Sequence, residues 1–212
     1  NGVHTVHLGD GNDQLTLGNG NSTVTLGNGD DVVHLAGGND SVQVGSGHNT
    51  YAFASNFGQD TIAATGGSTV LDFGAYGGGL FGSISATQGS FTANTGGNLG
   101  DRSQLLLTGS RITSLSLGGG ASQLHIHDFD PAAGTTALTI TDPTGNDELI
   151  YQPGLNDAAL TLDRSQLVSG PTTVSFDVGA KRLTILDPLF NDTAAPEIYA
   201  LSLRDAIPIT KL

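Results

Sequence analysis

The sequence contains no cysteine, no methionine and no tryptophan among its 212 residues. Without cysteine, the chain forms neither disulfide bonds nor thiolate-ligated metal sites. It also lacks any run of about 20 apolar residues, so no membrane-spanning helix is predicted. No secretory signal sequence is recognised, and the chain begins inside a repeat without a methionine. We therefore interpret the chain as a fragment of a longer protein.

Positive charge is scarce and unevenly placed. Seven Lys and Arg residues stand against 20 Asp and Glu residues, which gives a formal net charge of −13. Nucleic-acid phosphates would repel such a chain. Every basic residue lies at Arg102 or later, whereas the acidic residues of segment 1–63 are Asp10, Asp13, Asp30, Asp31, Asp40 and Asp60. Because nothing in that segment neutralises these aspartates, bound cations are expected there.

Glycine is abundant, with 32 residues, and much of it recurs with a period of nine. From Leu8 the sequence reads LGDGNDQLT, LGNGNSTVT, LGNGDDVVH, LAGGNDSVQ and VGSGHNTYA, followed by a lengthened copy, FASNFGQDTIA. The shared pattern is apolar-Gly-x-Gly-x-Asp-x-apolar-x. A fixed short period of this kind is typical of a solenoid.

Two apolar positions in each repeat are separated by one residue, so on a strand they point to the same face. One row comprises Val6, Leu15, Val24, Val33, Val42 and Tyr51, and the other comprises Leu8, Leu17, Leu26, Leu35, Val44 and Phe53. Each repeat is therefore predicted to form a short strand and a glycine-rich turn. Two repeats would make one coil, and stacked coils would bury both rows between two sheets.

A coil of two repeats places residues 18 apart above one another on one edge. Asp13 should lie over Asp31 and then Asn49, and the other edge should carry His4, Ser22, Asp40 and Asp60. Two bare carboxylates about 4.8 Å apart repel by about 3–4 kcal/mol at an effective dielectric constant of 20. A hard dication with oxygen ligands reverses that repulsion, so the array is expected to fold when it binds calcium. Ser22 and Asn49, which replace an acid, should make weaker half-sites, with two to four occupied sites in all.

The turn glycines are expected to allow positive φ and to leave carbonyl oxygens facing an ion. A metal-free solenoid, in which Asp and Asn only shape the turns, is the alternative interpretation.

The repeats resemble the haemolysin-type, or repeats-in-toxin (RTX), calcium-binding nonapeptide, and the resemblance covers residues 1 to about 63. It implies a parallel β-roll in which the first six residues of each repeat form calcium-binding turns. The residues that it assigns to metal binding are Gly9, Asp10, Gly11, Asp13, Gly18, Gly20, Gly27, Gly29, Asp30, Asp31, Gly38, Asp40, Gly45, Gly47 and Asp60. Asp13 with Asp31 is the best pair and Asp40 with Asp60 the second. The chain departs from the family pattern in that an apolar residue replaces the first motif glycine.

Beyond the repeats, the period is lost but strand patterns persist, and no amphipathic helix is predicted. Strands are expected at 68–73, 80–86, 104–109, 111–117, 123–127, 137–141, 148–151, 158–162, 172–178 and 181–186. The fold class is thus all-β, a calcium-binding parallel β-roll followed by an irregular β-rich region. Residues 64–130 would continue or close the solenoid, and 131–196 would form a small β unit or cap. Residues 197–212 would be a tail, and ALSLRDAIPIT within it resembles a translated sequencing adapter, so this tail need not be native.

No catalytic motif is recognised, and we expect the fragment itself not to be an enzyme, although a catalytic domain upstream is compatible with the resemblance. His125 and His127 share a strand face, followed by Asp128 and Asp130, but a zinc site needs at least a third ligand held nearby. An exposed polar strand face is the simpler interpretation of this pair.

The leading hypothesis is a secreted calcium-binding module that folds on extracellular calcium and supports export and stability of a larger protein by type I secretion. Its partners would be calcium ions and upstream domains of the same polypeptide. The alternative is a spacer or cap segment of a large surface adhesin or biofilm protein, with a surface or matrix ligand. Ice binding is disfavoured, because only Thr23 and Thr25 form a full Thr-x-Thr pair.

Overall fold

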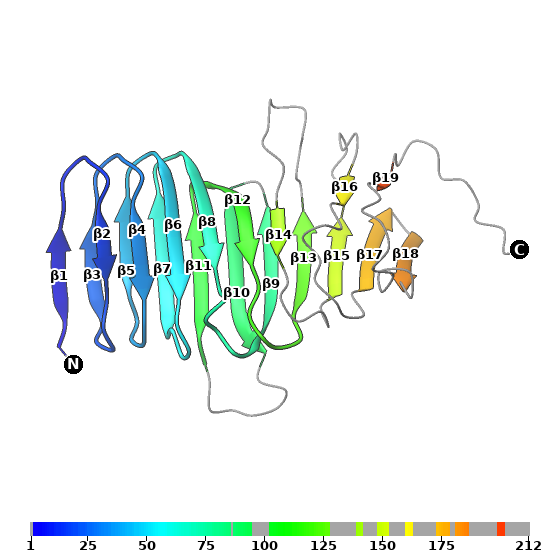
Figure 1. Ribbon diagram of the computed structural model, residues 1–212, viewed down its shortest axis with the longest axis horizontal. Coiled ribbons are helices and arrows are strands. Elements are labelled where there is room, and N and C mark those ends of the chain that lie inside the picture. Colours follow the sequence, from blue (N-terminus) through cyan, green and yellow to red (C-terminus); the bar gives the residue numbers. More distant parts are fainter. Residues whose placement is uncertain are drawn as a thin grey trace, which may run out of the picture.

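The computed structural model describes residues 2–85, 87–94, 102–127, 139–141, 148–152, 160–162, 173–178, 181–186 and 199–201. Within these residues the chain is all-β, and its strands stack side by side along one long axis (Figure 1). No helix in this described part is long and apolar enough to cross a membrane.

Most strands belong to two sheets. Sheet 1 has the order β1 (His4–His7), β3 (Ser22–Thr25), β5 (Ser41–Val44), β7 (Gln59–Ala64), β11 (Gln104–Thr108), β10 (Gln88–Asn94), β9 (Gly79–Ser85), β13 (Gln123–His127), β15 (Glu148–Gln152), β17 (Thr173–Val178), β18 (Lys181–Leu186). Sheet 2 has the order β14 (Thr139–Thr141), β12 (Arg111–Ser116), β8 (Ser68–Asp72), β6 (His48–Phe53), β4 (Val32–Leu35), β2 (Gln14–Thr16). The short strands β16 (Leu160–Leu162) and β19 (Tyr199–Leu201) pair with each other.

The repeats form the coil that their period predicts. Strands β1 to β8 alternate between the two sheets, and every pairing among them is parallel. Val6 pairs with Val24 in sheet 1, and Leu15 pairs with Val33 in sheet 2. The two extra residues of the lengthened sixth repeat lie in its turn, because Val42 still pairs with Ile62 in unbroken register. This arrangement of parallel strands is consistent with a β-roll.

Both predicted apolar rows form the core, because alternate strand residues face the opposite sheet. Val24, Val33, Val42 and Tyr51 are fully buried, and they join Leu17, Leu26, Leu35, Val44 and Phe53 in one cluster. Val6, Leu8 and Leu15 are only partly buried, because no described coil covers them on the N-terminal side.

Five aromatic rings pack where the regular repeats end. Phe53 stacks on Phe73 with ring centroids 4.3 Å apart, and Phe57 meets Phe53 edge-on at 5.1 Å. Tyr76 and Phe91 extend the cluster at centroid distances of 5.5 and 5.4 Å from Phe57 and Phe73. All five side chains are buried, so this cluster is the largest aromatic contact of the described core.

The stretch after the repeats departs from simple coiling. Strand β10 is antiparallel to both β9 and β11, so a hairpin is inserted into sheet 1. Parallel coiling resumes beyond it, where β11 pairs with β7, β12 with β8 and β13 with β9. All ten strands expected between residues 68 and 186 are present, whereas β10 and β19 were not expected.

Candidate metal centre

The aspartates predicted to stack on one edge of the coil do so. The backbone N–H of Asp13 donates to Oδ1 of Asp31 at 3.0 Å, and that of Asp31 donates to Oδ1 of Asn49 at 3.0 Å. Each link joins residues 18 apart, as one coil requires. We name the row Asp13, Asp31 and Asn49 the first acid row.

The opposite edge carries a second acid row, Ser22, Asp40 and Asp60. The N–H of Ser22 donates to Oδ1 of Asp40 at 2.7 Å, and the N–H of Asp40 donates to Oδ1 of Asp60 at 3.0 Å. The second link spans 20 residues, because the last repeat is longer. The two extra residues of the last repeat therefore leave the row in register.

The other oxygen of each inner carboxyl group has no partner. Asp31, Asp40 and Asp60 are only 1%, 2% and 3% exposed, and their Oδ2 atoms are buried without a hydrogen bond. A buried acceptor that lacks a partner is costly, and an unpaired buried charge is costlier. These three oxygens therefore need either a proton or a cation.

Burial raises the pKa of all three carboxyl groups. For Asp31, burial outweighs the lowering effect of the Asp13 N–H, and the charges of Asp13 and Asp30 raise the pKa further. Burial also raises the pKa of Asp40 against the hydrogen bond from Ser22. Burial, together with the charge of Asp40, raises the pKa of Asp60 to about 8. Asp60 is paired in register with the buried Leu105, so the next strand continues this row with an apolar residue in place of an acid.

The turn glycines bring successive coils into backbone contact. A Cβ on Gly29 or Gly47 would collide with the carbonyl oxygen of Gly11 or Gly29 in the coil before it. The expectation of positive φ is confirmed for Gly11, Gly29 and Gly47, and Gly38 also has positive φ. The same expectation was wrong for five other turn glycines, which do not have positive φ: Gly9, Gly18, Gly20, Gly27 and Gly45. Of these, Gly27 and Gly45 instead allow close approach to Gly9 and Gly27.

The carbonyl oxygens of the turn glycines differ in their hydrogen bonds, and those of Gly38 and Gly47 accept the N–H groups of Gln59 and Ser68 at 3.1 and 2.8 Å. The carbonyls of Gly9 and Gly27 accept N–H groups from Gly27 and Gly45 at 3.1 and 3.0 Å. Those of Gly11 and Gly29 accept none of the backbone hydrogen bonds in the described turns. Oxygen atoms free to face a cation thus come from Gly11 and Gly29 rather than from their partners.

Asp10 and Asp30 lie elsewhere, in two separate rows of exposed turn side chains. Oδ1 of Asp10 accepts the N–H of Asn28 at 2.8 Å, and Oδ1 of Asp30 accepts the N–H of His48 at 2.8 Å. In these exposed rows the side chain accepts from the following coil, whereas in the acid rows it accepts from the preceding one. Asp10 and Asp30 are therefore separate from the buried carboxyl groups.

Several asparagines that make the same kind of contact in the exposed turns of both edges were missed in the sequence. Asn12, Asn21 and Asn39 accept the N–H groups of Asp30, Asn39 and Gln59 at 2.9, 2.9 and 3.1 Å. Their signal was present, because Asn, Asp or Ser recurs at the third and fifth positions of most repeats.

The residues present fit a calcium ion. Calcium takes about six to eight oxygen ligands, including carboxylates and backbone carbonyls. No group of three or more His, Asp or Glu side chains that could hold a metal occurs in the described part of the chain. A cation in these turns would thus be held by one or two carboxylates and by carbonyl oxygens, which suits a hard oxygen-seeking ion.

The remaining predicted ligands are placed as follows. Asp13 is half-buried, and Gly9 and Gly18 lie in open turns where an added Cβ would meet no atom within 4 Å. Gly20 and Gly38 approach the carbonyls of Gly2 and Gly20. His125 is half-buried on β13, while Asp128 and Asp130 lie outside the described residues. Ligation by Asp13 and by these glycines stays a prediction, whereas His125, Asp128 and Asp130 were interpreted as part of an exposed polar strand face and not as ligands.

Comparison with known families agrees with the repeat pattern. Residues 7–42 and 18–51 match the RTX calcium-binding nonapeptide repeat, in four copies. The resemblance inferred from the sequence is thereby confirmed over residues 7–51, and the family it names is a structural calcium-binding repeat. No curated protein and no solved structure matches the chain.

Proposed function

We propose that residues 1–63 are a calcium-binding β-roll module of a secreted protein, in which the two acid rows hold the ions. The observation that carries the proposal is the set of buried Oδ2 atoms on Asp31, Asp40 and Asp60. These oxygens have no hydrogen bond and lie in a segment without Lys or Arg, and Asp31 and Asp40 belong to the stretch that matches calcium-binding repeats.

The ligands would come from two sources. Asp31 with Asp13, and Asp40 with Asp60, would supply carboxylate oxygens, and the turn glycines would supply carbonyl oxygens. When bound, the ion supplies positive charge that offsets burial of the carboxylates. A backbone N–H of the chain would hold Oδ1 of each acid, and this hydrogen bond would fix the position of Oδ2 for the ion.

Folding and ion binding would then be coupled. Each coil contributes half of a site, so the site exists only when two coils are stacked. In calcium-poor solution, unneutralised carboxylates oppose this stacking, whereas calcium that binds the folded chain stabilises it by mass action.

The rest of the chain would support this module. We propose that residues 64–130 close the solenoid, with the aromatic cluster as its anchor, and that 131–196 form a cap. Such a module would stay unfolded during export and fold outside the cell, where calcium is more plentiful. The module would support the export and stability of upstream domains of the same polypeptide.

The second candidate function is a spacer in a large surface adhesin. The elongated stacking of strands along one axis favours it, because such a stack separates what lies at its two ends (Figure 1). Both candidates share the calcium sites and differ in what the module is attached to.

The test is a calcium titration of the whole chain, followed by far-ultraviolet circular dichroism, with magnesium as the control ion. We expect β structure to increase with calcium and to respond weakly to magnesium. A spectrum that is already fully β in chelator and does not change with calcium would leave the metal-free solenoid as the correct interpretation.

A further inference from the structure

Among the described side chains of β1 to β13, none that is charged lies on the outward surface of sheet 1. Its outward side chains on β1, β3, β5, β7, β11, β10, β9 and β13, where described, are Ser, Thr, Gln and His, with three apolar residues. The acidic residues that the structure describes in this part of the chain lie in the turns, along the coil edges or, for Asp72, on sheet 2. We name this outward surface the flat face.

Hydroxyl groups on the flat face are in register. Thr5 pairs with Thr23, Thr23 with Ser41 and Ser41 with Thr61, and all four side chains are exposed. Neighbouring strands are about 4.8 Å apart, so the row presents one hydroxyl at each step. Every hydroxyl both donates and accepts hydrogen bonds, as do the hydroxyl groups of a sugar.

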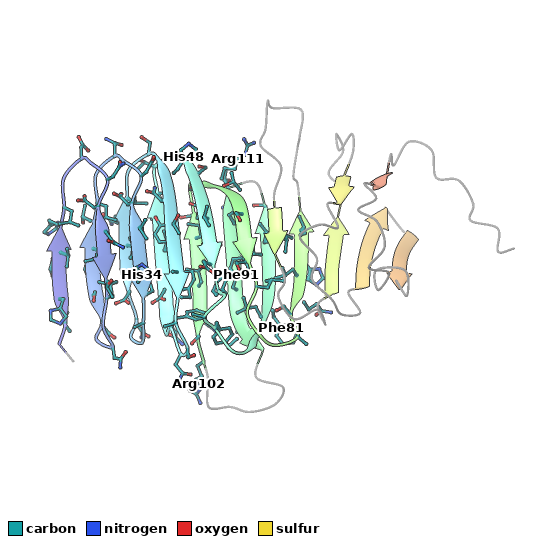
Figure 2. The ribbon with its side chains drawn as sticks, viewed as in Figure 1. His34, His48, Phe81, Phe91, Arg102 and Arg111 are labelled. Atoms are coloured by element: carbon teal, nitrogen blue, oxygen red, sulfur yellow. The ribbon has the colours of Figure 1, made fainter. Side chains whose placement is uncertain are left out.

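Beyond Thr61 the same face carries two large exposed apolar side chains. Leu106 on β11 is 47% exposed and Phe81 on β9 is 48% exposed. Strand β10 lies between them, with Ser90 opposite Leu106 and Thr92 opposite Phe81. We name Phe81, Thr92, Ser90 and Leu106 the Phe81 patch; Figure 2 shows Phe81 near the end of the strands at which Arg102 lies.

The charge distribution limits what this patch would bind. The chain carries a net charge of −13, but neither an acidic nor a basic side chain faces outward beside Phe81 in the described strands. A polyanion would be repelled by the acidic remainder of the molecule, and a polycation would be drawn to the aspartate edges instead. An uncharged partner rich in hydroxyl groups matches the flat face.

We propose that the Phe81 patch binds a neutral polysaccharide lying across the strands of sheet 1. The Phe81 ring would pack on the apolar C–H face of one sugar ring, and Leu106 would contact another. Ser90 and Thr92 would exchange hydrogen bonds with sugar hydroxyls between them, and the registered row from Thr61 to Thr5 would extend the track.

Other occupants fit the patch less well. A second copy of the chain would bring two acidic molecules together and would bury only two large apolar side chains per copy. An ice surface requires a regular array, whereas Leu106 interrupts the hydroxyl row at the strand after Thr61. The strands of the patch contain none of the aspartates assigned to calcium, so the inference does not depend on the proposed function.

The experiment is native affinity electrophoresis of the whole chain, in calcium, through gels that contain hydroxyethyl cellulose, dextran or galactomannan. We expect at least one of these neutral glycans to retard the chain, and dextran sulfate not to do so. Phe81→Ala should weaken binding by at least about tenfold, whereas Phe81→Tyr should retain it. His34→Ala, an exposed change on sheet 2, is the matched control and should leave retardation unchanged.

Ser90→Asp is a second test variant, which keeps the proposal testable if Phe81→Ala does not fold. Ser90 is exposed, so this change leaves the core intact. It should abolish retardation while the circular dichroism spectrum stays the same. Absence of retardation by all three neutral glycans, or equal retardation of the wild-type chain and both folded variants, would overturn the proposal. So would a dimer in sedimentation equilibrium that Phe81→Ala dissociates without any glycan binding, since that assigns the patch to a second copy.

Discussion

The two oxygens of the Asp60 carboxyl group have opposite surroundings. Oδ1 accepts the backbone N–H of Asp40 at 3.0 Å, while Oδ2 is buried and has no hydrogen-bond partner. The same division occurs in Asp31 and Asp40. One half of each carboxyl group therefore builds the coil, and the other half is available to a proton or a cation.

Replacing Asp60 with Asn should stabilise the fold in chelator but weaken ion binding in calcium. In chelator, Asp60→Asn should stabilise the fold, because it removes a buried group that must otherwise carry a proton or an unpaired charge. In calcium, it should weaken ion binding, with the midpoint of the titration raised by about tenfold or more. Circular dichroism with urea unfolding in each condition measures both effects.

The matched control for this change is Asp10→Asn, because Asp10 is exposed and lies outside the acid rows. It should change the calcium midpoint much less than Asp60→Asn. Equal effects of the two substitutions would contradict the assignment of the site to the buried carboxyl groups.

The stability of the calcium-free fold should fall as pH rises. The pKa of Asp60 is raised from 3.8 to about 8 in the fold, so between these values the folded chain binds more protons than the unfolded chain. The stabilising proton is therefore held at low pH and lost as pH rises through about 8. Urea unfolding in chelator at pH 5, 7 and 9 should show a decreasing midpoint.

Calcium binding should show the opposite pH trend, because the carboxylates must lose their protons to bind the ion. Asp60→Asn should flatten the chelator profile. A fold whose stability in chelator increases between pH 5 and 8 would contradict the burial of these groups.

Gly47→Ala should disrupt the coil, whereas Gly9→Ala should not. Gly47 has φ of 147°, and a Cβ there would collide with the Gly29 carbonyl of the preceding coil. Backbone strain of this type costs about 1–3 kcal/mol, and the collision adds to it. A Cβ on Gly9 meets no atom within 4 Å, so Gly9→Ala is the control. Thermal unfolding in saturating calcium compares the two, and equal melting temperatures would count against the backbone packing described.

Truncating Phe73 should destabilise the chain with and without calcium. Its ring is fully buried and stacks on Phe53 at 4.3 Å. Phe73→Ala should cost about 3–5 kcal/mol in unfolding free energy, because it leaves a large cavity in the aromatic cluster. Val24→Ala, in the repeat core, should matter chiefly in calcium if the repeats fold only with the ion. Urea unfolding of both variants in calcium and in chelator compares them, and the same calcium dependence in both would contradict a separate aromatic anchor.

Much of the repeat fold follows from the sequence, because the strands, turns and coils are set by residue spacings that are short and recur in every repeat. A nine-residue period with apolar residues two positions apart predicts strand, turn and a coil of 18 residues, and the pairing of Leu15 with Val33 has this offset. The same arithmetic predicted that Asp13 would stack with Asp31, as their hydrogen bond shows. The six acids and the glycine pairs indicated a cation before any geometry was available.

Later strands were recognised where apolar and polar residues alternate, as in QLHIH of β13. Strand β10 was not predicted from the sequence, because QGSFTAN contains only Phe91 and Ala93 as apolar residues. Its place in the sheet is set by antiparallel pairing with β9 and β11. No local pattern distinguishes such a hairpin from a loop.

The sequence by itself determined the period, the coil and which aspartates share an edge, because each depends on spacing along the chain. Only the tertiary structure decided which carboxyl oxygens lack a partner, since burial depends on what the next coil places above them. Asn49 accepts the N–H of Asp31 on one edge, and Leu105 is the register partner of Asp60 on the other. The tertiary structure also brought Phe81 and Leu106 to the two sides of β10, although they are 25 positions apart in the sequence, because a hairpin folds between them.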